Sequence, residues 1–304
     1  MTRLSLSDIS QSELAVRLRT GCLRLRLNPF VVSIRSGFGV VAEGLSRLYA
    51  DYELLSHDPC FIDFHVAVLP YRHLYKSLCV FEMDGFRPFT PLAAQEAYAF
   101  LEWGMNWCVT SHCHTFITIH SAVLERSGRV LIMPAPPGSG KSTLCAALML
   151  HSWRLFSDEM ALIDPATGMV TPSPRPVSLK NQSIDIIRQR APSATFGPVA
   201  RDTLKGTVAH MRVTPDSLFR AEQSARPAWL VFPKYEAGST LRPVIRPKAS
   251  SLMQLTENSF NPHVHGRNGF NALADLVDQS DCYDLTYSNL DEAITWFDQL
   301  LIPS

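Results

Sequence analysis

The spacing of apolar residues predicts a small module of helices and strands in the first third of the chain. Residues 22–27 alternate apolar and basic side chains, a pattern typical of a half-buried strand. Ser10 and Glu13 match a capping box and predict a helix to about Arg19. Residues 40–49 place their apolar side chains on one helical face. By similar criteria we expect strands at 30–35, 61–69 and 78–83, and a helix from Thr90 to about Trp107.

The pattern changes near residue 108. Residues 129–133 form a strand that is apolar on both faces, and a loop, a helix at 141–151 and a buried strand at 154–163 follow it. Residues 165–227 read as a long loop rich in proline, serine and charge. The other elements expected here are strands at 116–124, 228–233 and 243–248, and helices near 183–190, at 270–279 and at 289–301. We therefore predict an N-terminal α+β module at 1–108 and an α/β domain at 109–304.

Composition narrows the classes of partner. Lys+Arg and Asp+Glu are both 28, so no bulk basic field points to nucleic acid or to an anionic membrane. No segment approaches the ~20 consecutive apolar residues of a membrane-spanning helix, and the N-terminus lacks an apolar signal core. The seven cysteines form no CxxC pair, which favours reduced thiols in a cytoplasmic protein.

The strongest chemical signal is a phosphate-binding loop at 134–143. It nearly satisfies the pattern G-x-x-x-x-G-K-[ST], with Ala135 where the pattern has glycine. A buried strand precedes it and a helix follows it, so a chance Gly/Ser/Pro loop is a poor explanation. Glycines let backbone amides approach phosphate oxygens, and the helix N-terminus adds partial positive charge. The residues predicted to bind the nucleotide are Pro137, Gly138, Ser139, Gly140, Lys141, Ser142 and Thr143.

Three of these residues receive specific roles from the motif. Lys141 would contact the β- and γ-phosphates of ATP, and the Ser142 hydroxyl would be a ligand of Mg²⁺. Thr143 would bond a phosphate nearer the nucleoside.

Asp158 and Glu159 are the candidate acidic partners of this loop. They stand inside an otherwise apolar strand, and acidic side chains are rarely buried unless they are paired. The alternative is that the two acids lie at an exposed end of the strand. Asp158 lies 17 residues after Lys141, which leaves room for one helix, a turn and half a strand. ABC-type and motor ATPases carry their acidic strand much later in the chain, whereas small-molecule kinases of the shikimate type share the short spacing.

The order of these motifs resembles the catalytic domain of HPr kinase/phosphorylase, which is related in fold to PEP carboxykinase. A strand bearing His120, a hairpin, the phosphate loop and the Asp158-Glu159 strand follow one another as in that family. The branch that it resembles most is HprK-related kinase A, through the segments 174–181, 205–212 and 257–261. The resemblance covers most of the chain and implies an α/β P-loop kinase core of the HPr kinase/PEP carboxykinase type.

The resemblance also implies roles for individual side chains. Asp158 would be the general base towards the acceptor hydroxyl and would also border the metal, and Glu159 would be a Mg²⁺ ligand. His120 would lie near the transferred phosphate. Lys180 stands where the family has an arginine and would neutralise charge in the transition state, without arginine's two-pronged geometry. The more usual acid pair is Asp-Asp, so Glu159 is a departure.

The acceptor is expected to be a serine hydroxyl of a protein or peptide, with His210 and Arg212 lining its site. Asn181-Gln-Ser replaces the glycine-rich signature of HPr kinases, which argues against HPr itself as the acceptor. Residues 165–227 are expected to form a basic rim that orders around the acceptor. A small-molecule hydroxyl kinase and a catalytically inactive nucleotide-binding protein remain as alternatives. HPr kinases are hexamers, so a homo-oligomer is possible.

Overall fold

The computed structural model describes residues 3–55, 60–136 and 138–300 of the chain. They form a mixed α/β structure with three sheets and two compact units. One unit contains Met1–Val109 together with Arg175–Leu218, and the other contains Thr110–Pro174 and Phe219–Ser304. The first segment ends beside the expected boundary at 108, but Arg175–Leu218 groups with the N-terminal unit instead of with the α/β domain.

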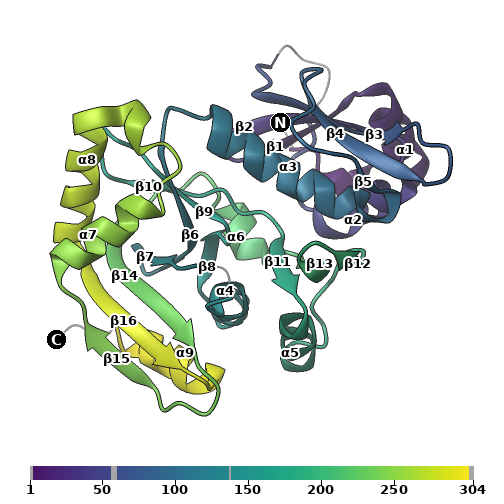
Figure 1. Ribbon diagram of the computed structural model, residues 1–304. Coiled ribbons are helices and arrows are strands. Elements are labelled where there is room, and N and C mark those ends of the chain that lie inside the picture. The colour runs from purple at the N-terminus through teal and green to yellow at the C-terminus, as the bar shows by residue number, and fades with distance from the viewer. Residues whose placement is uncertain (1–2, 56–59, 137, 301–304) are drawn as a thin grey trace. The chain divides into compact units, whose positions relative to one another are not determined.

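The N-terminal unit is built on a five-stranded sheet in the order β1-β2-β3-β4-β5 (Figure 1). Ser10 caps α1 by accepting a hydrogen bond from the Glu13 amide at 3.2 Å, as predicted. The helix expected from Thr90 begins later, because Leu92–Ala93 instead pairs with β4. The elements are η1 (Leu6–Asp8), α1 (Gln11–Thr20), β1 (Leu23–Leu27), β2 (Phe30–Ser36), α2 (Gly39–Leu48), β3 (Phe64–Tyr71), β4 (Leu78–Met83), β5 (Leu92–Ala93), η2 (Ala94–Glu96) and α3 (Ala97–His112).

Residues 165–227 are not the long loop that the sequence indicated. Their proline and serine residues separate strands too short to show a period, and β11, β13 and β12 pair into a three-stranded sheet. The elements are β10 (Val170–Thr171), β11 (Val177–Lys180), α5 (Gln182–Arg190), β12 (Ala200–Thr203), β13 (Gly206–Met211) and α6 (Pro215–Phe219). The expectation that this segment orders only around an acceptor is therefore wrong.

A buried carboxylate explains why part of this segment belongs to the N-terminal unit. Glu102 of α3 is only 3% exposed and accepts hydrogen bonds from the hydroxyls of Tyr49 and Tyr98, at 2.8 and 2.6 Å. Arg175 lies 3.7 Å from the same carboxylate and supplies the opposite charge. A buried charge is tolerated only when it is paired and hydrogen-bonded, so Arg175 is required beside α3. Burial, and then the charge of Glu102, raise the pKa of both tyrosines well above the usual value.

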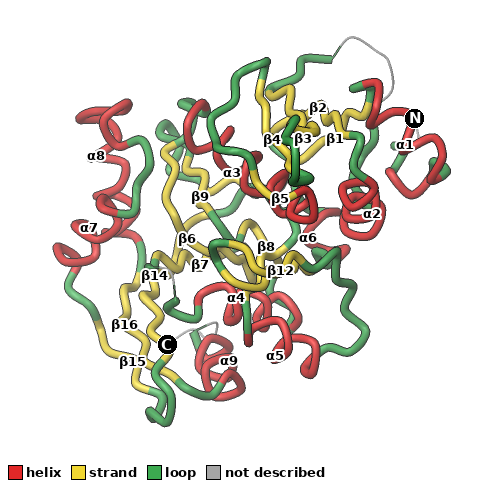
Figure 2. The backbone as a smooth tube through the Cα atoms, turned by 45° about the vertical axis from the view of Figure 1, so that its right-hand side comes forward, coloured by secondary structure: helices red, strands yellow, loops and turns green. Residues whose placement is uncertain are grey.

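The second unit is built on an eight-stranded sheet in the order β10-β9-β6-β7-β14-β16-β15, with β8 also paired to β6. Strands β7, β14 and β16 are parallel neighbours. Figure 1 shows α7 and α8 on one side of this sheet and α4 and α9 on the other; Figure 2 shows the same elements turned by 45°. The elements are β6 (Ile117–Arg126), β7 (Arg129–Pro134), α4 (Lys141–Leu150), β8 (Arg154–Ser157), β9 (Met160–Ile163), β14 (Arg226–Tyr235), β15 (Arg242–Ile245), α7 (Lys248–Glu257), α8 (Pro262–Gln279), β16 (Asp281–Tyr287) and α9 (Leu290–Gln299).

The expected strand at 154–163 is interrupted at its centre. It splits into β8 and β9, and the break is at Asp158 and Glu159. The Ser157 hydroxyl accepts the amides of Glu159 and Met160 at 3.2 and 3.1 Å, so the turn is closed by a side chain. The two acids therefore sit on a short turn in the middle of a sheet, not within a regular ladder.

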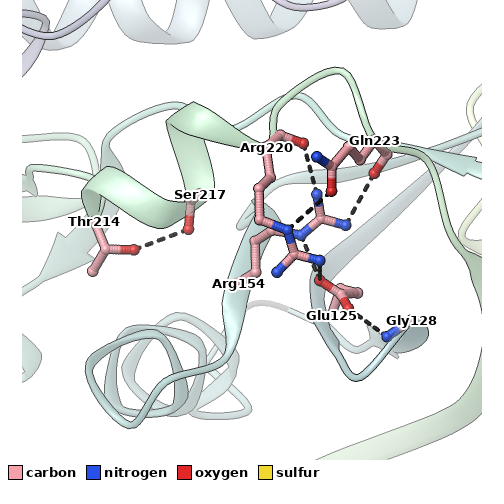
Figure 3. A network of polar contacts seen from close by, with 7 residues as sticks. All are labelled: Glu125, Gly128, Arg154, Thr214, Ser217, Arg220 and Gln223. Carbon is pink, nitrogen blue, oxygen red and sulfur yellow. Dashed lines mark hydrogen bonds and ion pairs between the residues drawn. The ribbon is translucent and has the colours of Figure 1, made fainter.

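A buried ionic network fixes β8 against β6 (Figure 3). Glu125 is fully buried, and its carboxylate accepts from Arg154 Nε at 2.5 Å and from the Gly128 amide at 2.6 Å. Arg154 also donates to the backbone carbonyls of Arg220 and Gln223, at 2.6 and 2.9 Å. Glu125 and Arg154 stand opposite each other in the ladder, so the network holds the register of β8 as well as the chain at 220–223.

We predict that Glu125→Gln lowers the free energy of unfolding by about 3–5 kcal/mol, because it leaves the Arg154 guanidinium buried without its carboxylate. Glu43→Gln is the control, since Glu43 pairs with Arg47 at 3.0 Å on an exposed helix face. Such a pair contributes about 0.3–0.5 kcal/mol. Urea unfolding followed by tryptophan fluorescence measures both. Equal losses in the two variants would contradict a structural role for the network.

Candidate nucleotide-binding site

The predicted phosphate loop lies between β7 and α4. Strand β7 ends at Pro134 and α4 begins at Lys141, as the motif requires. Gly138 and Gly140 have φ of 86° and 84°, a region that favours glycine. Pro137, also predicted to bind the nucleotide, lies outside the described residues. Ala135, the departure from the motif, is buried without a positive φ, so its position does not demand glycine.

Two tyrosines from distant strands hold the end of this loop. The Tyr287 hydroxyl of β16 donates to the Gly140 carbonyl at 3.2 Å, and the Tyr235 amide of β14 donates to the Ser139 carbonyl at 2.9 Å. A Cβ added to Gly140 would lie 2.5 Å from the Tyr287 hydroxyl oxygen and 2.9 Å from the Tyr235 Cβ. Glycine is therefore required at 140 both for its backbone angle and for space. Sequence reasoning did not single out either tyrosine.

The loop also contains a buried polar atom that is suited to a ligand. Ser139 is 9% exposed, and its Oγ has no hydrogen-bond partner among the described residues. Buried hydroxyls are nearly always hydrogen-bonded in folded proteins. The first amides of α4 have no partner within the helix either, by the geometry of helix ends. A hydroxyl and helix amides in one loop are the donor set that phosphate oxygens accept from.

Lys141 and His120 meet beside this loop. Lys141 is 7% exposed, and its Nζ lies 3.0 Å from His120 Nε2. An ammonium group only donates, so this contact requires an unprotonated Nε2 and places the imidazole proton on Nδ1. His120 is on β6, as predicted, and its side chain is 29% exposed. The lysine of the loop is thus held towards β6.

The acidic pair lies next to the same histidine. Glu159 Oε2 is 3.8 Å from His120 Nε2, and the Glu159 side chain is 26% exposed. Asp158 is 4% exposed. The Ser121 amide donates to the Glu159 carbonyl at 3.2 Å, which fixes the turn beside His120.

The thiol of Cys145 lies near several of these charged groups. This residue of α4 is fully buried, and its pKa is raised mainly by burial. The charge of Asp158 raises the pKa further, that of Lys141 lowers it, and that of Glu159 raises it. Lys141 and both predicted acids are therefore within electrostatic reach of one atom. The assignment of these three residues to a nucleotide site stays a prediction.

The segment 257–261, noted in the sequence only as a family pattern, positions His120. The His120 amide donates to the Asn258 carbonyl at 2.8 Å, and the Phe260 amide donates to the Thr118 carbonyl at 2.9 Å. The Phe260 ring lies 5.9 Å from the imidazole. Asn261 is 1% exposed, and its side chain bonds the Thr118 amide and the Phe116 carbonyl, at 2.9 and 2.8 Å. These residues extend the sheet beside the start of β6.

Three other predicted site residues lie in the N-terminal unit. His210 of β13 is 2% exposed, and its ring packs edge-on against Tyr98 at 5.5 Å. Arg212 forms an ion pair with Asp51. Lys180 ends β11, and its amide donates to Ser183 Oγ at 2.8 Å. His210 is thus packed within that unit, and the role of all three side chains at an acceptor site stays a prediction.

The predicted Mg²⁺ ligands are Ser142, Asp158 and Glu159. Among the described residues, no group of three or more His, Cys, Asp or Glu side chains is arranged to hold a metal ion. Mg²⁺ commonly takes one or two carboxylates, several waters and the phosphates of a substrate. The residues present fit an ion that arrives with a nucleotide, with Ser142 in the first turn of α4 and the two acids on the turn between β8 and β9.

A scan against protein-family models finds no match for this chain, and a search of curated proteins finds none. None of the helices in the described residues is long and apolar enough to cross a membrane.

We predict that Gly140→Ala destabilises the protein more than Gly138→Ala does. Both glycines are left-handed, which costs an alanine about 1–2 kcal/mol. Only Gly140 has neighbours within 4 Å of the added Cβ, and such overpacking costs about 1–3 kcal/mol more. Melting temperatures compare the two variants directly. Equal shifts would show that the tyrosines do not confine the loop.

Proposed function

We propose that this protein is a kinase that binds ATP with Mg²⁺ and transfers the γ-phosphate to a hydroxyl group. The observation that carries the proposal is the approach of Lys141 Nζ to His120 Nε2, at 3.0 Å, with Glu159 Oε2 3.8 Å from the same nitrogen. A phosphate-loop lysine, a histidine and an acidic pair thus share one place on the sheet. In phosphoryl transfer, positioning and charge neutralisation supply most of the catalysis.

The charges of the site suit this reaction. Lys141 is buried beside the helix N-terminus, so its attraction for phosphate oxygens is little screened by water. Asp158 is the proposed general base, since a buried carboxylate close to the phosphates can accept the proton of an acceptor hydroxyl. Ser142 and Glu159 would hold Mg²⁺, which neutralises phosphate charge when bound.

The arrangement of strands supports a core of the HPr kinase/PEP carboxykinase type. A hairpin of β6 and β7 leads into the phosphate loop, and the strand that carries the acids returns antiparallel to β6. His120 lies on the central strand of this arrangement. This order of parts is the one on which the family resemblance rests.

The acceptor that we propose is a serine hydroxyl of a protein or peptide. The proposal comes from the family resemblance, and the absence of the glycine-rich signature after Lys180 argues against HPr itself as that protein. Asn181 stands at that point with φ of 52° and ψ of −127°, a backbone conformation that glycine adopts more readily. A small-molecule hydroxyl kinase is the second candidate, because the short spacing from Lys141 to Asp158 is shared with kinases of that kind.

The direct test is phosphate transfer from γ-labelled ATP. We expect label on a serine-containing peptide encoded near this gene, and no label with Lys141→Ala, which removes the buried ammonium. Free serine is the parallel substrate. Label on the free amino acid alone would replace the peptide proposal with the small-molecule one. Hydrolysis and transfer both absent from a protein that binds ATP would contradict kinase activity and favour a nucleotide-binding protein.

A second prediction separates the two acids. Asp158→Asn should lower transfer by roughly 10²–10⁴-fold, the usual contribution of a general base, while ATP binding is retained. Glu159→Gln should instead raise the Mg²⁺ concentration required for half-maximal activity. Glu43→Gln, on an exposed helix face, is the control and should change neither quantity. Identical behaviour of the two site variants in both assays would show that the assigned roles are wrong.

A further inference from the structure

The carboxyl ends of three parallel strands meet at the phosphate loop. β7 leads into the loop itself, β14 ends at Tyr235, and β16 ends at Tyr287. Parallel neighbours present their carboxyl ends at one edge of a sheet, where ligands of α/β proteins commonly bind. The loops after β14 and β16 also contact each other, since the Glu236 amide donates to the Tyr287 carbonyl at 3.0 Å.

The two flanks of β7 differ in chemistry. On one side lies β6, with His120 directed at Lys141 and the acidic turn beside it. On the other side lie β14 and β16, whose ends supply Tyr235 and Tyr287. A nucleotide whose terminal phosphate is held at Lys141 and the acids must direct its nucleoside away from them. The side of β14 is the one left for the base.

Tyr235 has an aromatic surface available at that position. Half of the residue, 50%, is exposed, although its backbone is fixed to the loop through Ser139. Tyr287 supports this ring in a T-shaped contact, with the two centroids 5.8 Å apart. Tyr287 is 1% exposed and cannot itself meet a ligand face to face. An anchored, exposed ring with a buried support is the arrangement that base stacking requires.

We propose that the Tyr235 ring is the stacking surface for the base of a nucleotide seated on the phosphate loop. The inference rests on the proposed nucleotide binding and adds the nucleoside subsite to it. Every base has a π face, so a stack of this kind gives affinity with little discrimination between adenine and guanine.

The substitution Tyr235→Ala isolates the ring. It keeps the Cβ that lies next to Gly140 and the amide that bonds Ser139, so the phosphate loop retains both supports. Loss of a base–aromatic stack costs about 1–3 kcal/mol. At 1.4 kcal/mol per tenfold change, this is a roughly 5- to 150-fold higher Kd. Tyr235→Phe keeps the ring and should bind as the wild type does.

Calorimetric titration of the whole protein with Mg-ATP and with Mg-tripolyphosphate provides the test. We expect Tyr235→Ala to weaken ATP binding and to leave tripolyphosphate binding unchanged, because the latter has no base. Tyr71→Ala, at a residue 42% exposed on the N-terminal unit, is the control for loss of a surface ring. Weakening of both ligands alike, or of neither, would overturn the stacking proposal while the phosphate loop stands. A wild-type protein that binds neither ligand would overturn the nucleotide site and the stack together.

Discussion

The backbone pairing of β6 is the constraint on which the candidate site depends. Ser121 is opposite Pro134, where the phosphate loop begins, and its amide also bonds the carbonyl of Glu159. His120 is opposite Met160, directly after the acidic turn. One two-residue stretch of strand thus holds the loop, the histidine and the acids in register. Since a slip of one residue reverses every side chain in a strand, this register must be specified strongly.

The buried network at the other end of β6 supplies that specification. Glu125 and Arg154 are directly opposite in the ladder, and each also bonds backbone groups outside it. A shifted register would leave two charges buried without partners, at a cost of several kcal/mol. The ion pair between Glu125 and Arg154 therefore acts mainly by destabilising shifted registers of β8, and less by stabilising the native register. The ion pair is separated from the acidic turn by the length of β8, within which the pairing with β6 contains one irregularity, between Val123 and Leu124.

The sequence was informative where structure is local. The phosphate loop, α4 and β7 follow from glycine, apolar periodicity and a known motif, and their bounds agree with the structure within about two residues, whereas the strand expected at 154–163 divides into β8 and β9. The same reasoning missed β16 and α7, for which no element was expected, whereas the strand expected at 243–248 corresponds to β15. The short strands in 165–227 were also missed, because two to six residues cannot show a period.

The features of the site that the sequence did not predict depend on contacts between segments that are distant along the chain. The support of Gly140 by Tyr287 joins residues 147 apart in the sequence, and no local pattern marks such a pair. The same holds for the pairing of the segment 257–261 with β6, which fixes His120. The sequence indicated functional side chains on α4 and on the strand that follows it, because both are close to the loop along the chain. It did not indicate the side chains that the more distant strands β14 and β16 bring to the loop. Gly140 itself was the one sequence signal for these contacts, because a position that has no space for a side chain has close neighbours.

Ala135 and Glu159, the two residues that depart from the pattern expected from the sequence resemblance, differ in their structural consequences. Ala135 replaces a glycine, yet it is buried with an ordinary backbone angle, so the substitution requires no distortion of the loop. Glu159 replaces an aspartate, and the longer side chain extends its carboxylate to 3.8 Å from His120 and leaves it partly exposed. The turn that carries Glu159 is fixed by Ser157. Because a glutamate side chain is longer than that of aspartate, its carboxylate can reach an ion that lies farther from the backbone of this turn. Ala135 therefore requires no change in the backbone of the predicted phosphate loop, whereas Glu159 is the departure that would affect the proposed metal site.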